Sequence, residues 1–285
     1  MRLGFHVSIS NSIDQAVDIA VAMECSIFQI FTRNPRGWSF QSLESREVAA
    51  FRDKVRSYKI SLVFDHMPYL PNLASAREEI YTRSVASLKA ELERCAELGI
   101  PFLVTHLGSH LGAGKASGFK RIIRAINSAF SEVRGDVVIL LENTAGTMNS
   151  MGTSFEDIRQ VIDGVEDSWR VGVCFDTCHG FAAGYDLRGT EAVSQVIELF
   201  DDTLGLERLK LVHLNDSKGS LGSRIDRHEH IGLGRIGEEG FRSILHSEFG
   251  RMPLIMETPV DKRRSDLDNF EKVRELASIG MPSTG

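Results

Sequence analysis

The sequence contains no C-x-x-C motif and no long apolar run, and these absences exclude several classes of protein. Its four cysteines among 285 residues indicate neither a disulfide framework nor a zinc knuckle. No apolar run approaches the roughly 20 residues that span a bilayer. Residues Met1 to Ser10 also lack the apolar core of a signal peptide. We therefore expect a cytoplasmic protein with reduced cysteines and no membrane partner.

An excess of basic residues is also missing. Lys and Arg together number 33 and Asp and Glu number 39, which gives a formal net charge of −6. This balance argues weakly against a nucleic-acid partner, because phosphate backbones favour basic surfaces. The objection weakens if bound cations offset the carboxylates. A hydrophobic content of 42% and a charged content of 25% are those of an ordinary globular protein with a full core.

Short apolar runs rich in Val, Ile and Phe alternate with amphipathic segments, and eight such pairs are present. In Ile80 to Leu98, for example, apolar residues recur at roughly helical spacing. Strands that alternate with helices imply a parallel sheet, and eight units in this length favour a closed barrel. We predict an α/β fold, a single (β/α)8 TIM barrel over residues 1–285 with a frayed tail after Pro282. The predicted strands are Leu3–Ser8, Ile27–Thr32, Ser61–Asp65, Phe102–Thr105, Val137–Leu141, Val171–Phe175, Leu209–Leu214 and Leu254–Met256.

Polar side chains follow nearly every predicted strand. In a barrel the carboxyl ends of all strands meet at one face, so these residues would surround a single pocket and form its active site. Converging acids would repel one another unless cations or protons intervened, and imidazoles with carboxylates are ligands of zinc-type sites. The residues are His6, Arg33 to Trp38, His66 with Tyr69, His106 with His110, Glu142, Asp176 with His179, His213, and Glu257.

The stretch from Leu211 to Gly234 is the richest in such residues. The spacing of Asp226 and His228 permits chelation of one ion, whereas spacing does not assign the other ligands to particular ions. The alternative is a solvated loop with ordinary charges. A lone histidine near an apolar strand is also more often satisfied by a backbone hydrogen bond. We expect supporting or structural roles, rather than metal binding, for His6, His110 and His230, because metal-bound imidazoles need outer partners.

Six segments between His66 and Pro259 carry a specific resemblance. They read HMPYLPNLAS, THLGSH, LLENTAG, CFDTCHGFAAGYD, LVHLNDSKGSLGSRIDRHEHIGLG and METP. In this order they resemble the motifs of the endonuclease IV family of apurinic/apyrimidinic endonucleases. The resemblance implies a monomeric TIM-barrel enzyme that repairs double-stranded DNA by cutting on the 5′ side of abasic sites. Its products would be a 3′-hydroxyl and a 5′-deoxyribose phosphate, and trimming of blocked 3′ ends is left open.

The resemblance also implies three zinc ions, with manganese as an alternative at one position. Glu142 would bridge two of them and is the expected catalytic residue, beside a metal-activated hydroxide that attacks phosphorus. The four acids carry −4 and three zinc ions carry +6, so the filled site would be positive and would suit a phosphate. The implied ligands are His66, His106 and Glu142 for the first metal, Glu142, Asp176, His213 and Glu257 for the second, and His179, Asp226 and His228 for the third.

Lesion recognition is expected from the loops that follow the second and third strands. By resemblance, Arg36, Tyr69 and Leu70 would bind the substrate in its minor groove. An apolar or aromatic wedge offsets the cost of unstacking, and an abasic nucleotide has already lost its stacking. The alternatives are loop packing for Tyr69 and Leu70 and a solvated charge for Arg36.

Two other functions fit part of the sequence. Metal-dependent sugar isomerases also place acids and histidines at barrel strand ends around two divalent ions, but they would not need His179, Asp226 and His228. A module that binds damaged DNA without cutting it would not need an intact ligand set. The complete set of metal ligands therefore favours the nuclease. Measured cleavage of an abasic duplex would decide between the nuclease and a module that only binds DNA.

Overall fold

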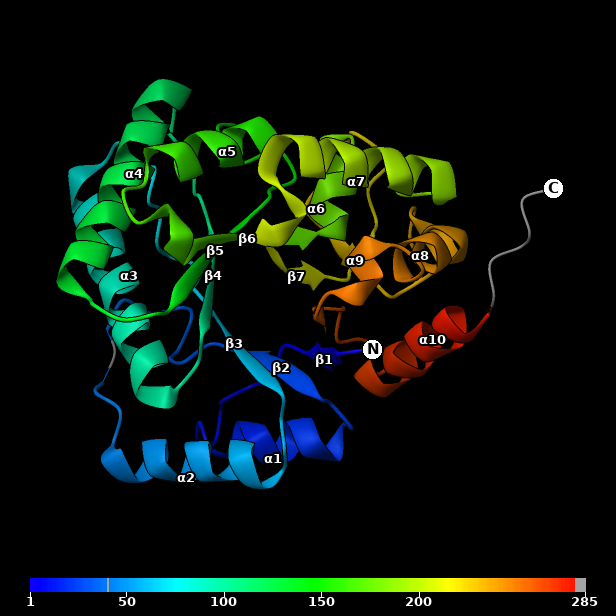
Figure 1. Cartoon of the computed structure of the whole chain (residues 1–285), viewed down its shortest axis with the longest axis horizontal. Helices are drawn as coiled ribbons and strands as arrows, with labels where there is room; N and C mark the ends of the chain where they lie inside the picture. Colours follow the sequence, from blue (N-terminus) through cyan, green and yellow to red (C-terminus); the bar gives the residue numbers. More distant parts are fainter. Residues whose placement is uncertain (40, 280–285) are drawn as a thin grey trace.

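The computed structural model describes residues 1–39 and 41–279, and its centre is a ring of eight parallel strands (Figure 1). Their order is β1, β10, β7, β6, β5, β4, β3, β2. A parallel bridge between His6 and Gln29, with a 2.7 Å hydrogen bond from the Val7 amide to the Gln29 carbonyl, joins β1 to β2. The predicted (β/α)8 barrel is therefore confirmed. The strands are β1 (Leu3–Phe5), β2 (Ile27–Ile30), β3 (Leu62–His66), β4 (Phe102–His106), β5 (Val138–Glu142), β6 (Val171–Asp176), β7 (Leu209–His213) and β10 (Leu254–Met256).

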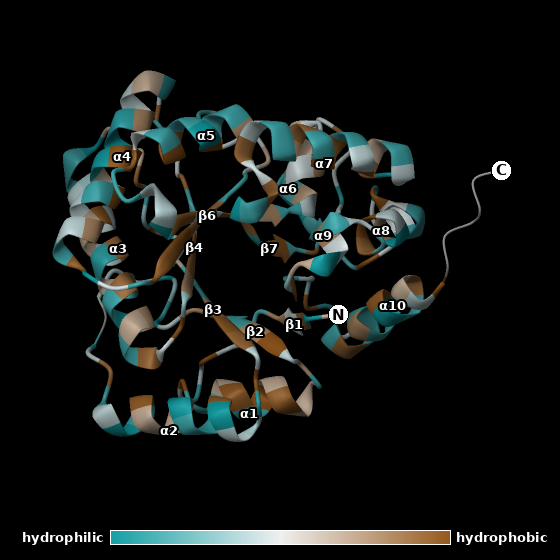
Figure 2. Cartoon of the chain, in the orientation of Figure 1, coloured by the Kyte–Doolittle hydropathy of each residue, from teal (hydrophilic) through white to brown (hydrophobic). Residues whose placement is uncertain are grey.

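Helices surround the ring and turn their apolar faces toward it (Figure 2). Along α4, for example, Phe119, Ile122 and Ile126 recur at helical spacing and are all buried. Within residues 1–39 and 41–279, no helix combines the length and the apolarity needed to cross a bilayer. The α-helices are α1 (Gln15–Ala22), α2 (Ser45–Ser57), α3 (Glu78–Leu98), α4 (Lys115–Glu132), α5 (Phe155–Gly164), α6 (Thr177–Ala183), α7 (Thr190–Leu204), α8 (Gly237–Leu245), α9 (Glu248–Arg251) and α10 (Asp266–Ser278), with 3₁₀ turns at Ser168–Arg170 and Leu206–Arg208.

The core has two parts, because barrel strands bury both faces. A large cluster fills the space between strands and helices. A smaller one is a layer to which seven strands contribute one residue each, so the barrel is filled and is not a pore. Truncating Phe64 in this layer to alanine would lower the free energy of unfolding by about 3 to 5 kcal/mol. The members of the layer are Ile27, Phe64, Val104, Leu140, Cys174, Leu211 and Ile255.

Most of the other strands begin or end one or two residues from their predicted positions, and two features differ more from the sequence-based expectation. The first strand is shorter than predicted, because beyond Phe5 only the isolated bridge of His6 continues the pairing. A two-stranded antiparallel hairpin, β8 (Asp216–Ser217) with β9 (His228–Glu229), lies within the loop after β7 and was not predicted. Two-residue strands are too short to show an alternating pattern. The predicted frayed tail after Pro282 lies outside the described residues.

Candidate metal centre

Nine side chains predicted as ligands converge at the carboxyl ends of the strands. Five of them are the last residues of β3 to β7, and Glu257 directly follows β10. The final residue of a barrel strand points into the mouth of the barrel, which explains why residues far apart in sequence meet there. The five are His66, His106, Glu142, Asp176 and His213.

The ligand atoms fall into groups in which all atoms lie within 4.8 Å of one another. Three of these groups have the same members as the three ligand sets expected from the resemblance. Imidazole nitrogens and carboxylate oxygens at this spacing suit zinc, so the residues could hold metal ions. The groups are His66, His106 and Glu142; Glu142, Asp176, His213 and Glu257; and His179, Asp226 and His228.

A further group contains a thiol, since Cys178 lies near Asp176 and His228. Burial raises the pKa of Cys178 to about 12, so its thiol keeps the proton at neutral pH. Its side chain is fully buried, and its two neighbours Asp176 and His228 already belong to two of the groups without a thiol. Cys178 is therefore better described as a core residue beside the centre, and the oxygen and nitrogen donors carry the site.

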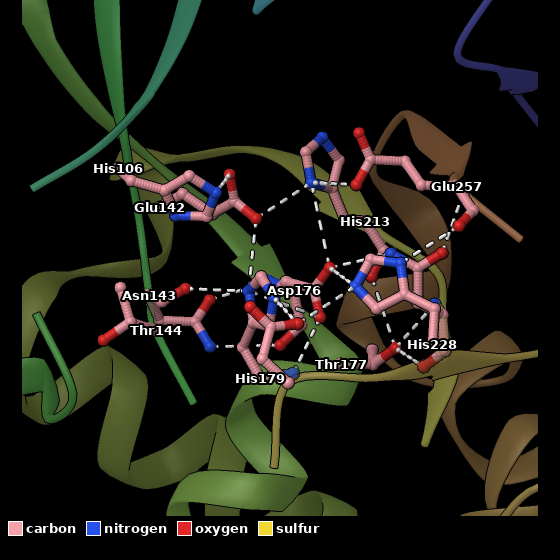
Figure 3. A network of polar contacts seen from close by, with 12 residues as sticks. His106, Glu142, Asn143, Thr144, Asp176, Thr177, His179, His213, His228 and Glu257 are labelled. Carbon is pink, nitrogen blue, oxygen red and sulfur yellow. Dashed lines mark hydrogen bonds and ion pairs between the residues drawn. The ribbon is translucent and has the colours of Figure 1, made fainter. Parts of the chain in front are cut away.

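Glu142 lies among the imidazoles of His106, His179 and His213 (Figure 3). Its Oε2 lies 3.2 Å from Nε2 of His66 and 3.5 Å from Nε2 of His106. Its Oε1 lies 3.2 Å from Nδ1 of His213 and 3.3 Å from Nδ1 of His179. The two oxygens thus face different groups of ligands, which is the arrangement that a bridging carboxylate needs.

Backbone carbonyls orient three of the histidines. Nδ1 of His66 lies 2.7 Å from the Met67 carbonyl, and Nδ1 of His179 lies 3.1 Å from the Asn143 carbonyl. Nδ1 of His228 lies 3.0 Å from the carbonyl of Glu257. A carbonyl only accepts hydrogen bonds, so each Nδ1 carries a proton, and in the neutral ring Nε2 keeps its lone pair for a ligand.

The electrostatics of the metal-free cluster are those of tightly paired charges. Burial would lower the pKa of His179, but the charge of Asp176 and bonds to Asp226 and Glu142 raise it well above its usual value. Burial would raise the pKa of Glu142, but neighbouring imidazoles, among them His213, hold it well below its usual range. The carboxylate of Glu142 is therefore ionised at neutral pH and able to bind cations.

Tyr69 and Leu70 follow β3 at the rim of the centre. They are 64% and 38% exposed, which leaves both available to a ligand. The ring of Tyr69 packs edge-on against Phe31 at 5.0 Å between centroids, and its amide donates to the carbonyl of Pro35. Tyr69 lines two pockets, of about 610 and 380 Å³, that both reach the candidate metal ligands. Arg36 is exposed in the neighbouring loop. Tyr69 and Leu70 thus stand beside the cluster without joining it, and Arg36 directly follows Pro35, whose carbonyl accepts from the Tyr69 amide.

Asp216 has a structural role. It is buried, and its carboxylate accepts hydrogen bonds from the amides of Gly232, Gly234 and Ile236 at 2.8–3.0 Å. A Cβ on Gly234 would lie 2.4 Å from the Asp216 carboxylate, so only glycine fits there. Asp216 therefore fixes the loop beside the hairpin that carries His228.

The three histidines left to supporting roles also lie outside the ligand groups. His110 accepts from the amides of Gly112 and Gly114 and shapes the turn after β4. His230 is buried between Asp261 and Asn269. His6 lies against Gln29 and the carboxylate of Glu257.

Comparison with known proteins decides the family. A family model described as a xylose isomerase-like TIM barrel matches residues 17–278. A protein named probable endonuclease 4 from Methanoculleus marisnigri is 58% identical over 277 residues, which cover 96% of this chain and 98% of the relative. The chain belongs to the endonuclease IV family. The family predicted from the sequence motifs is therefore confirmed.

Solved structures agree with this assignment. The crystal structure of endonuclease IV from Thermus thermophilus matches with a TM-score of 0.84 and 36% identity, and 97% of each chain is covered. A D-tagatose 3-epimerase-like protein matches with a TM-score of 0.71 and 19% identity over 97% of each chain. The second likeness shows a shared barrel only.

Three residues that contact the candidate ligands of this endonuclease IV chain were not predicted from the sequence. Asn215 donates to Oδ2 of Asp176 at 2.7 Å, and Asn143 accepts from the Asp176 amide at 2.7 Å. Asn143 directly follows β5 and Asn215 lies two residues after β7, so their position at strand ends was the available signal. For Gln29, the signal was weaker: it is a polar residue within the apolar strand β2, where it is buried.

Proposed function

We propose that the protein is an apurinic/apyrimidinic endonuclease that cuts duplex DNA on the 5′ side of abasic sites. The observation that carries this proposal is the position of Glu142, whose two oxygens face different ligand groups. Membership of the endonuclease IV family supports the choice of DNA as the substrate. Three zinc ions would be held by the three ligand groups, with manganese as an alternative at one position.

The reaction is the hydrolysis of one phosphodiester. Water adds to phosphorus, the bond from phosphorus to the preceding 3′ oxygen breaks, and that oxygen takes a proton. The products are a 3′-hydroxyl and a 5′-deoxyribose phosphate. Divalent ions, when bound, supply a water of lowered pKa and neutralise charge on the phosphate. Trimming of blocked 3′ ends uses the same bond cleavage and belongs to the same proposal.

The protein's own residues have separable tasks in this reaction. Glu142 belongs to two ligand groups and would supply charge to the ions held by both. His179, Asp226 and His228 form the group nearest the exposed rim, since the side chain of Asp226 is half exposed. Tyr69 would fill the space left by the missing base, between the two pockets it lines. The exposed guanidinium of Arg36 would pair with phosphate.

The sugar isomerase alternative is weaker for a structural reason. Two divalent ions need only the first two ligand groups, whereas this chain brings a third group together from α6 and the β8–β9 hairpin. Tyr69 and Leu70, exposed at the rim, also suit a large substrate better than a small sugar. These features favour the nuclease.

The deciding experiment uses a labelled duplex with one abasic site and a matched intact duplex. Protein purified without chelator should cut only the abasic strand, and elemental analysis should find close to three metal ions per chain. Exhaustive chelation should abolish cleavage, and zinc should restore it. A reproducible metal content of one or none with full activity would overturn the three-metal site. Absence of cleavage by fully loaded protein would overturn the proposed activity.

A further inference from the structure

Gln29 is a fully buried polar residue on β2 whose side chain reaches the metal ligands. Its Oε1 lies 2.9 Å from Nε2 of His213. Its Nε2 donates to Oε1 of Glu257 at 2.8 Å and lies 2.9 Å from Nδ1 of His6. One amide therefore contacts two residues of the Glu142, Asp176, His213 and Glu257 group.

The chemistry of these partners fixes the orientation of the amide. A carboxylate only accepts hydrogen bonds, so the NH₂ of Gln29 must face Glu257 and its oxygen must face His213. An amide oxygen is also only an acceptor, and Nε2 of His213 must then carry a proton. The lone pair of a neutral His213 ring is thereby left on Nδ1, which lies 3.2 Å from Oε1 of Glu142.

This orientation is the reverse of that of the other oriented ligands. His66, His179 and His228 each turn Nδ1 to a backbone carbonyl and present Nε2 to the centre. His213 presents Nδ1, and a side chain rather than the backbone sets that choice. The same amide occupies Oε1 of Glu257, so Oε2 is the oxygen left facing Nδ1 of His213, at 3.5 Å.

We propose that Gln29 is a positioning residue for the second metal, and this rests on the three-metal site proposed above. Its amide turns Nδ1 of His213 and one oxygen of Glu257 toward the same point. Because partners that orient a metal ligand typically change metal affinity by about 10- to 100-fold, their loss is measurable without any assay of cleavage.

The test measures zinc binding by Gln29→Leu, which has a similar volume but no hydrogen-bonding group. Competition with a chromophoric chelator should show one of the three zinc ions bound at least tenfold more weakly than in the wild type. The other two should be unchanged. Gln160→Leu is the matched control, because Gln160 is exposed on α5, away from the centre, and should leave all three affinities intact.

A second variant and a spectroscopic readout keep the test decisive if Gln29→Leu fails to fold. In Gln29→Glu a carboxylate still accepts from His213 but faces Glu257 with like charge, so zinc affinity should fall while the His213 proton stays on Nε2. Spectra of ¹⁵N-histidine-labelled protein report which ring nitrogen is protonated. In the zinc-loaded wild type, one ligand histidine should carry its proton on Nε2.

Two results would overturn the inference. One is unchanged affinity for all three zinc ions in both Gln29 variants. The other is a zinc-loaded wild type in which every metal-bound histidine is protonated on Nδ1. Neither result depends on cleavage of abasic DNA, so failure of this inference and failure of the proposed activity would be seen in different measurements.

Discussion

Arg33, in the loop after β2, forms a buried ion pair with Glu91 of helix α3. The other carboxylate oxygen of Glu91 accepts from the hydroxyl of Thr32, and Arg33 also donates to Ser87 at 2.7 Å. From the same helix, Arg94 donates to the carbonyls of Thr32 and Gln41. Helix α3 thus holds both ends of the loop that carries Arg36.

Replacing Glu91 with glutamine should therefore loosen this loop. Removing one partner of a buried ion pair costs about 3 to 5 kcal/mol of unfolding free energy, because the other charge stays buried. We expect that loss in denaturant titrations, together with weaker binding of abasic duplex and an unchanged zinc content. Glu93→Gln, at an exposed position of the same helix, is the control and should change neither quantity. If Glu91→Gln binds abasic duplex with wild-type affinity, the ion pair does not contribute to recognition of the lesion.

Replacing Glu142 with glutamine should abolish cleavage and leave the fold intact. The change removes the charge shared by two ligand groups and keeps nearly the same side-chain volume. We expect the cleavage rate on abasic duplex to fall at least about a hundredfold, or about 2.7 kcal/mol in barrier, with DNA binding less affected. Glu97→Gln, which is exposed, should cleave normally. A rate within about tenfold of wild type would show that Glu142 does not bridge.

Replacing Tyr69 and Leu70 together with alanine should weaken capture of abasic duplex without changing metal content. Each side chain contributes about 1.5 to 3 kcal/mol when fully buried, so affinity should fall at least roughly tenfold. Cleavage at saturating substrate should fall less than kcat/KM if the contacts are equal in ground and transition states.

A binding titration at fixed salt, on protein made inactive by Glu142→Gln, compares abasic with intact duplex. Tyr58→Ala with Leu199→Ala provides the control, since both are exposed outside the metal centre. If discrimination between the two duplexes survives the loss of Tyr69 and Leu70, these residues serve only to pack their loop.

Zinc binding should release protons at pH 7 and weaken as the pH falls. Burial would lower the pKa of both His179 and His213. The charge of Asp176 and other neighbours instead raises the pKa of His179 well above its usual value, and Glu257 is among the groups that do the same for His213. In the metal-free protein both rings are therefore imidazolium cations at pH 7. Zinc binds only the neutral ring, so each ring must lose a proton. Lowering the pH favours the protonated rings and opposes zinc.

Calorimetry in two buffers of different ionisation enthalpy counts the protons released. Glu142→Gln should release fewer, because a carboxylate that stabilises both imidazolium rings is gone. Equal heats in the two buffers for the wild type would contradict the assignment of protonated histidines.

Much of this protein can be predicted from local sequence patterns. The alternation of apolar runs with amphipathic segments predicts the barrel, since each pattern depends on residues within one strand or one helix. Positions such as Glu142 and Asp176 follow from the same patterns, because a polar residue that ends a buried barrel strand must face the mouth. The motifs around them suffice to predict the family.

Other features were decided only when distant segments packed together. Gln29 contacts His213 across 184 positions of sequence, and no local pattern reports which ring nitrogen faces the centre. Arg33, at the end of the second predicted strand, resembles a site residue in sequence, yet 58 positions separate it from the buried carboxylate of Glu91 that holds it. Hydrogen bonds and ion pairs of this kind depend on distances of about 3 Å, and those distances exist only once the barrel has closed.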